Sequence, residues 1–140
     1  VRMLAEAGVP VGVMAAPVIP GLNDSEMPAV LEAAHKAGAK AAGYILLRLP
    51  LTVEPVFREW LSRARPLQAE KIEGRIRASR GGKFSDSTWG RRMRGEGEIA
   101  DQIRSLFRLF REKLQFGDLP PLDCSRFQPP EPASGQLRLF

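Results

Sequence analysis

The residues that decide the fold are Val11-Gly12-Val13-Met14-Ala15, followed directly by Ala16-Pro17-Val18-Ile19-Pro20-Gly21-Leu22-Asn23-Asp24. The first part is apolar without alternation, which is typical of a strand covered on both faces in a parallel sheet. The Pro- and Gly-rich second part predicts a loop, and its Asn23 or Asp24 can cap a helix over residues 25–37. The stretch is therefore half of a strand–loop–helix unit, in which ligands bind at the loop after the strand.

A helix precedes this stretch, and a second strand follows the helix over residues 25–37. Residues 1–7 have the composition of a helix end closed by Gly8, and Gly38 ends the helix over residues 25–37. A second apolar run over residues 41–47 stops at Arg48-Leu49-Pro50. This order predicts right-handed parallel β/α units. Two strands are too few for a closed barrel, so we expect residues 1–52 to be the C-terminal part of a partial (β/α) barrel of TIM type. The start at Val1 rather than Met also leads us to expect a fragment of a longer protein.

The composition changes after Thr52. Amphipathic patterns predict helices over residues 53–63 and 66–79, a loop over 80–87 and a helix over 98–115. The last helix carries a regular apolar stripe, made of Ile99, Ile103, Leu106, Phe107, Phe110 and Leu114. We expect residues 53–117 to form a basic helical extension of this α/β fold. Residues 118–140 are rich in Pro and Ser, and we expect a disordered tail there.

The net charge of +5 lies entirely in the second part of the chain. The surplus is densest over residues 71–94, where the only acidic residues are Glu73 and Asp86. The basic residues there are Lys71, Arg75, Arg77, Arg80, Lys83, Arg91, Arg92 and Arg94. Such a segment suits a polyanion, most simply nucleic acid, and it equally suits a solvated helix face.

Two aromatic residues lie among the basic residues at the end of this segment. Lys83, Arg91, Arg92 and Arg94, with Phe84 and Trp89 among them, combine charge with stacking surface, as single-stranded or distorted DNA or RNA requires. The alternative is a solvated loop with one aromatic anchored in the core, and it is at least as plausible for Trp89.

Cysteine content and hydropathy exclude several classes of protein. Cys124 is the only cysteine, so the chain has neither an internal disulfide nor a CxxC metal pair, and a reducing cytoplasm is the default location. No apolar run approaches the roughly 20 residues of a membrane span, and no signal-peptide pattern is present. His35 falls on the outer side of its helix, and we expect it at the surface. Cys124 is most simply a small buried or tail residue; the alternative is a reactive thiol, although no neighbour in the sequence would lower its pKa.

The segment Pro17-Val18-Ile19-Pro20-Gly21-Leu22-Asn23-Asp24 resembles the GxIxGxxE motif of radical S-adenosylmethionine enzymes. Ile19 and Gly21 match, whereas Pro17 stands at the first Gly and Asp24 at the Glu. Three further strings make the chain similar to bacterial proteins related to spore photoproduct lyase, a DNA repair enzyme: Arg48-Leu49-Pro50, Gly81-Gly82-Lys83-Phe84 and Asp123-Cys124-Ser125-Arg126-Phe127. The similarity runs from Val1 to about Pro130, as the C-terminal half of such a protein.

The resemblance implies that Ile19, Gly21, Asn23 and Asp24 line the adenine side of S-adenosylmethionine. On a barrel, Arg48 would lie at the rim and could hold a cofactor carboxylate or a substrate phosphate. The alternatives are an ordinary strand-to-helix turn and an Arg48 that pairs with a neighbouring acid.

Family members bind a [4Fe–4S] cluster through CxxxCxxC, which this chain lacks. S-adenosylmethionine and the cluster are therefore expected in the full-length parent only, and this fragment alone should hold no cofactor and be inactive. The parent would cleave the cofactor reductively and abstract hydrogen from a substrate such as a damaged nucleobase.

The last residues, Gln136-Leu137-Arg138-Leu139-Phe140, resemble the QLxLF peptide by which bacterial proteins bind the DNA polymerase sliding clamp. Gln136 would anchor the peptide through hydrogen bonds, while Leu137, Leu139 and Phe140 would fill apolar pockets. The alternative is a terminal segment that folds back on its own domain. A second hypothesis for the whole chain follows: a non-catalytic nucleic-acid-binding module tethered to the clamp.

Overall fold

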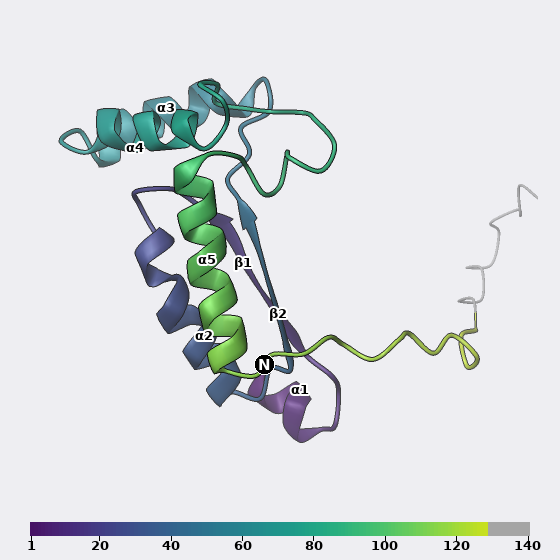
Figure 1. Ribbon diagram of the computed structural model, residues 1–140. Coiled ribbons are helices and arrows are strands. Elements are labelled where there is room, and N and C mark those ends of the chain that lie inside the picture. Colours follow the sequence, from purple (N-terminus) through teal and green to yellow (C-terminus); the bar gives the residue numbers. More distant parts are fainter. Residues whose placement is uncertain (129–140) are drawn as a thin grey trace, which may run out of the picture.

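The computed structural model describes residues 1–128, which form a mixed α/β structure (Figure 1). Its elements are α1 (Arg2–Glu6), β1 (Gly12–Val18), a 3₁₀ turn η1 (Asp24–Glu26), α2 (Met27–Lys36), β2 (Ala41–Leu46), α3 (Val53–Ala64), α4 (Ala69–Ala78) and α5 (Glu98–Lys113). Every predicted helix and strand is present. None of the helices within residues 1–128 has the length and apolarity to cross a bilayer.

The two strands pair in parallel, as the sequence predicted, with Gly12 opposite Ala41 and Val18 opposite Leu46. β1 continues to Val18, beyond the apolar run that ends at Ala15. The register shifts between Ala15 and Val18, where β1 carries one residue more than β2. Pro17 lies in this bulge, where a residue without an N–H group interrupts no ladder hydrogen bond. The loop that was expected to begin at Ala16 therefore begins at Ile19.

Helices α2 and α5 cover one face of the sheet (Figure 1). Val13 and Ala15 of β1 and Ala42 and Tyr44 of β2 pack there against a core that includes Met27, Leu31, Ala34, Leu46, Ala100 and Ile103. All six residues of the stripe predicted on α5 belong to this cluster. The packing thus joins α5 to the β/α units, although α3 and α4 lie between β2 and α5 in the sequence.

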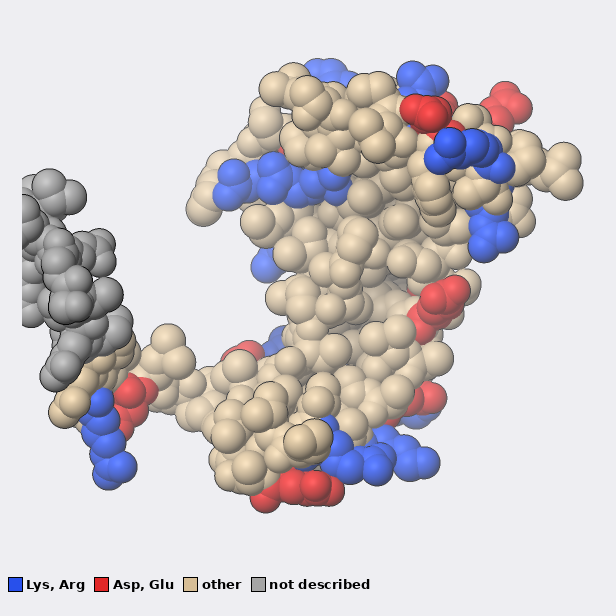
Figure 2. Space-filling model, turned by 180° about the vertical axis from the view of Figure 1, so that it is seen from behind, with Lys and Arg blue, Asp and Glu red and all other residues tan. Residues whose placement is uncertain are grey.

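The opposite face of the sheet has no covering layer in the described part of the chain. Gly12, Met14 and Ala16 project there from β1 and are exposed, and Met14 has 58% of its surface accessible. The Met14 side chain lies over Gly43 of β2, where a Cβ atom would approach its Cε to 2.9 Å. Seen from behind, the middle of the molecule shows few charged side chains (Figure 2).

A second core lies at the carboxyl ends of the strands, where α3 and α4 pack across them (Figure 1). Its buried members are Leu47, Leu49, Leu61, Ile72, Ile76 and Phe84. Ile19 and Leu22 of the loop after β1 pack against this cluster. The helical extension therefore begins as a cover over the strand ends.

Arg80, just past the end of α4, joins the two cores. Its side chain is buried, with 2% of the residue accessible. The guanidinium donates to the carbonyl oxygens of Leu46 (3.3 Å), Leu47 (2.6 and 3.1 Å) and Arg92 (3.0 Å). Burial lowers the pKa of Arg80, and the nearby charge of Arg48 acts in the same direction. Arg80 is thus a structural residue, and this member of the basic segment is not available to a polyanion.

We expect Arg80→Met to lower the free energy of unfolding by about 3 kcal/mol, because buried carbonyl oxygens lose their donors. Urea denaturation of the 140-residue chain, followed by circular dichroism, measures this loss. The matched control is Arg65→Met, an exposed arginine, which should change stability by less than about 0.5 kcal/mol. Equal losses in the two variants would show that the Arg80 hydrogen bonds contribute nothing specific.

Candidate ligand-binding loop and basic surface

Asn23 fixes the conformation of the loop after β1. Its Oδ1 accepts a hydrogen bond from the Ile19 N–H at 2.6 Å, and its Nδ2 donates to the Pro17 carbonyl oxygen at 3.1 Å. Neither η1 nor α2 has a side-chain capping hydrogen bond. The expectation that Asn23 or Asp24 caps the helix is therefore wrong, because the amide of Asn23 bonds back to the loop instead.

The other residues predicted to contact adenine face α4. Asp24 forms an ion pair with Arg75 at 3.7 Å. Gly21 adopts a φ of 82°, and a Cβ there would approach Arg75 Cδ to 2.7 Å. Gly21 is thus required by its left-handed conformation and by the close passage of a side chain of this protein. Ile19 packs on the second core. The predicted contact of these residues with a cofactor stays a prediction.

Arg48 is the predicted site residue with unused hydrogen-bonding capacity. It lies two residues after the end of β2 and is half-buried. Its Nε is buried and has no hydrogen-bond partner among the described residues. The Leu47 N–H donates to the Val18 carbonyl oxygen at 2.8 Å, so Arg48 and Ile19 leave adjacent strand ends. A guanidinium with a free donor beside a second arginine, Arg80, is suited to an anion.

A shallow hollow of about 230 Å³ lies beside β1. It is lined by Met14, Pro17 and Val18 of β1, by Asn23, and by residues of α2 such as Val30. β1 pairs only with β2 in the described chain, so this hollow follows the unpaired edge of β1. Ile19 and Gly21 do not line it, so it does not bring the predicted adenine contacts together.

Much of the basic segment is neutralised within the chain. Arg75 pairs with Asp24, Arg77 pairs with Glu73, and Arg91 pairs with both Asp86 and Glu96. The Arg77 guanidinium also lies over the Phe84 ring, 4.4 Å from its centre. Within residues 1–128, the members of the segment that form no ion pair are Lys71, Lys83, Arg92 and Arg94, together with the buried Arg80.

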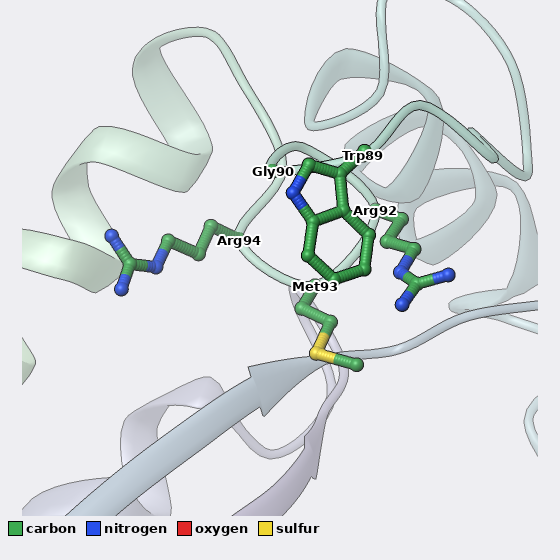
Figure 3. A pocket seen from close by; sticks show the side chains of 5 residues that line it. All are labelled: Trp89, Gly90, Arg92, Met93 and Arg94. Carbon is green, nitrogen blue, oxygen red and sulfur yellow. The ribbon is translucent and has the colours of Figure 1, made fainter.

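Trp89, Gly90, Arg92, Met93 and Arg94 line a pocket of about 370 Å³ in the loop between α4 and α5 (Figure 3). Trp89 is 80% accessible, and the Arg92 guanidinium stacks on its indole, 4.6 Å from the ring centre. Phe84, in contrast, is buried. The core-anchored aromatic of this loop is therefore Phe84, and Trp89 is the exposed one.

Asp86 organises the start of this loop. Its carboxylate accepts a hydrogen bond from the Thr88 N–H at 2.8 Å and pairs with Arg91 Nε at 3.3 Å. The hydrogen bonds from Thr88 are the main reason why the pKa of Asp86 lies below its ordinary value, and the charge of Arg91 adds to them. Because Arg91 is held here, Arg92 and Arg94 are the arginines of this loop that remain free of ion pairs in the described chain.

The remaining residues singled out in the sequence are exposed or lie outside the described residues. His35 and Cys124 are exposed, and His35 contacts the edge of Phe116 at 5.6 Å between ring centres. Within residues 1–128 no group of three His, Cys, Asp or Glu side chains could hold a metal ion. The predicted clamp-binding residues, Gln136, Leu137, Leu139 and Phe140, lie outside the described residues.

A comparison of this chain with models of protein families, with curated proteins and with solved structures found no match.

The role of Asn23 can be tested by Asn23→Asp. A carboxylate is a good helix cap, so a capping residue would tolerate this change. We expect instead a loss of about 1 kcal/mol at neutral pH, because the carboxylate cannot donate to the Pro17 carbonyl oxygen. Urea denaturation measures the loss, and Ser25→Asp, an exposed change in the same turn, is the control. Unchanged or increased stability of Asn23→Asp would restore the capping interpretation.

Proposed function

We propose that this chain is the C-terminal half of a radical S-adenosylmethionine enzyme with a partial (β/α) barrel. In this proposal Arg48 binds the anionic end of the cofactor or substrate, and the loop over residues 19–24 lies on the adenine side. The activity of the complete enzyme would be reductive cleavage of the cofactor and hydrogen abstraction from a substrate, for which we propose a nucleic acid.

The observation that carries this proposal is the buried Nε of Arg48 just beyond the carboxyl end of a parallel strand, which has no hydrogen-bond partner within residues 1–128. Ligands of open and closed α/β sheets bind at these strand ends. The uncovered sheet face supports the proposal as well, because Gly12, Met14 and Ala16 are small or apolar and suit the lining of a barrel interior. The sheet edges are unpaired beyond the single bridge from Gly117 to Ala41 in the described chain, so further strands could extend it.

The chain does not fit the iron–sulfur cluster. Cys124 is its only cysteine, whereas a cluster site needs at least three thiolates. The cluster ligands would have to come from a segment outside these 140 residues. Arg48 fits S-adenosylmethionine better, because a guanidinium can bind the carboxylate of its methionine portion.

The test uses the complete gene product, purified anaerobically. We expect it to contain CxxxCxxC upstream, to show the absorption of a [4Fe–4S] cluster and to bind S-adenosylmethionine. Arg48→Ala should weaken this binding by about tenfold in isothermal titration calorimetry, because one charge-assisted hydrogen bond is lost. Arg48→Lys should retain part of the affinity.

The matched control is Arg63→Ala on α3, whose side chain is 76% accessible, and it should bind the cofactor as the wild type does. A gene product without a thiolate triplet would overturn the enzymatic proposal. Equal affinity of the wild type and Arg48→Ala would show that Arg48 does not bind the cofactor, while the enzymatic proposal would still stand.

The second candidate is a non-catalytic nucleic-acid-binding module, whose C-terminal peptide would tether it to the sliding clamp. The exposed Trp89 with Arg92 stacked on it favours this function, because an aromatic platform beside cations can stack an unpaired base. The same surface would serve the enzyme if its substrate were nucleic acid. The two candidates therefore differ in catalysis and share the loop over residues 83–94.

Trp89→Ala tests this loop directly. We expect it to weaken binding of a fluorescent oligothymidylate by about tenfold, since stacking on one aromatic contributes about 1–3 kcal/mol per base. Fluorescence anisotropy measures the affinity, and Trp60→Phe, at the other tryptophan of the chain, should leave it unchanged. If the wild-type chain does not bind the oligonucleotide at low salt, the loop is ordinary protein surface.

A further inference from the structure

A second cavity of about 370 Å³ lies between α5 and the outer edge of β2. Ala42, Gly43 and Tyr44 of β2 and Phe107 of α5 are among its lining residues. Gly117 pairs with this edge at Ala41, and beyond that point no described strand pairs with it. The cavity is therefore a groove that remains open along the edge of the sheet.

The charged residues of this groove are mostly arginines. Arg94, Arg104, Arg108 and Arg111 line it, and Asp118 is the one carboxylate among the lining residues. Arg104, Arg108 and Arg111 follow the i, i+4, i+7 spacing of one helix face, which places them along about 10 Å of α5. Like charges at i, i+4 destabilise a helix slightly, so this row does not serve the stability of α5 itself.

Little in the described chain neutralises this row. Arg94 and Arg108 form no ion pair within residues 1–128. Arg104 pairs with Asp101, and Arg111 pairs with Asp118 at 2.9 Å, but both carboxylates are well exposed. Exposed pairs of this kind contribute little and can exchange one partner for another anion.

Two polar groups of the lining also lack partners. The Tyr44 hydroxyl and Arg111 Nε are buried and form no hydrogen bond in the described chain. Both can donate a hydrogen bond, as can the four guanidinium groups. A groove with this excess of donors is complementary to a ligand that carries negatively charged acceptors along its length.

The groove and the Trp89 pocket share one lining residue, Arg94. Its side chain extends from the loop towards α5 (Figure 3). The two cavities therefore lie on either side of Arg94, and a chain-like ligand is the kind that could occupy both. The two parts offer different chemistry, since the groove provides cations and Trp89 provides a stacking surface.

We infer that the groove binds the sugar–phosphate backbone of a single-stranded nucleic acid whose next base stacks on Trp89. An unpaired strand combines regularly spaced phosphates with exposed base faces, which match the arginine row and the indole respectively. An acidic peptide would use the cations but not the aromatic platform. The inference rests on the proposal that the loop over residues 83–94 binds nucleic acid, and it adds Arg104 and Arg108 to that site.

The test measures binding of fluorescent oligothymidylates of about 4 and about 12 nucleotides to the 140-residue chain. The groove variant is Arg104→Ala with Arg108→Ala, and Trp89→Ala is the loop variant. We expect the groove variant to weaken binding of the longer strand by about tenfold and to reduce the salt slope by about 0.7 for each arginine. The shorter strand should lose affinity in Trp89→Ala but not in the groove variant.

The matched control is Arg63→Ala with Arg65→Ala, which removes the same charge from α3 and the turn after it and should change either affinity by less than about twofold. Oligouridylates tested in parallel show whether RNA or DNA is preferred. If Trp89→Ala weakens binding and the groove variant does not, the groove inference is wrong while the loop proposal holds. If the wild type binds neither strand, both fail. Competition by polyglutamate as strong as that by the longer strand would show a non-selective anion surface and overturn the inference.

Discussion

The buried guanidinium of Arg80 is the interaction on which the arrangement of this chain depends. An arginine can be buried only if its donors are satisfied, because desolvation of its charge is otherwise very unfavourable. Here the acceptors are carbonyl oxygens of Leu46, Leu47 and Arg92 rather than a carboxylate. These oxygens belong to the end of β2 and to the loop before α5, while Arg80 itself follows α4. One side chain therefore fixes three segments that are distant in the sequence.

Both candidate surfaces are positioned by this connection. Arg48 follows Leu47, one of the residues whose carbonyl oxygen Arg80 binds, and the nearby charge of Arg48 helps to lower the pKa of Arg80. On the other side, Arg92 accepts from Arg80 while the Leu46 N–H donates to the Met93 carbonyl oxygen at 3.0 Å. The loop that carries Trp89 is thus attached to the end of β2 through the carbonyl oxygens of two consecutive residues, Arg92 and Met93. A site built on such a rigid support loses less conformational entropy when a ligand binds.

The sequence predicted the elements well and their connections less well. Unbroken apolar runs identified β1 and β2, and the apolar stripe identified α5. The runs also predicted that both faces of the strands are covered, which is wrong for the described chain, where Met14 and its neighbours on β1 are exposed. The sequence pattern did not identify the partners of polar side chains that lie far apart in the chain. Asn23 has the composition of a cap but bonds to Ile19 and Pro17, and Arg80 has the composition of a surface residue but is buried. Phe84 and Trp89 could not be told apart either, since Arg58 and Arg77 cover the Phe84 ring from helices whose packing the sequence does not show.

The basic residues that cluster in the sequence are not the ones that the fold leaves available to a partner. In the sequence the basic segment centres on residues 71–94, but Arg75, Arg77 and Arg91 are paired and Arg80 is internal. The α5 arginines did not stand out, because Asp101, Glu112 and Asp118 lie among them in the sequence. Folding places Arg94 beside Arg104 and Arg108, all of which line one groove. The cations available to a partner therefore gather where the loop before α5 meets that helix. An electrostatic surface follows from which charges the fold leaves unpaired, and only the distances between side chains determine this.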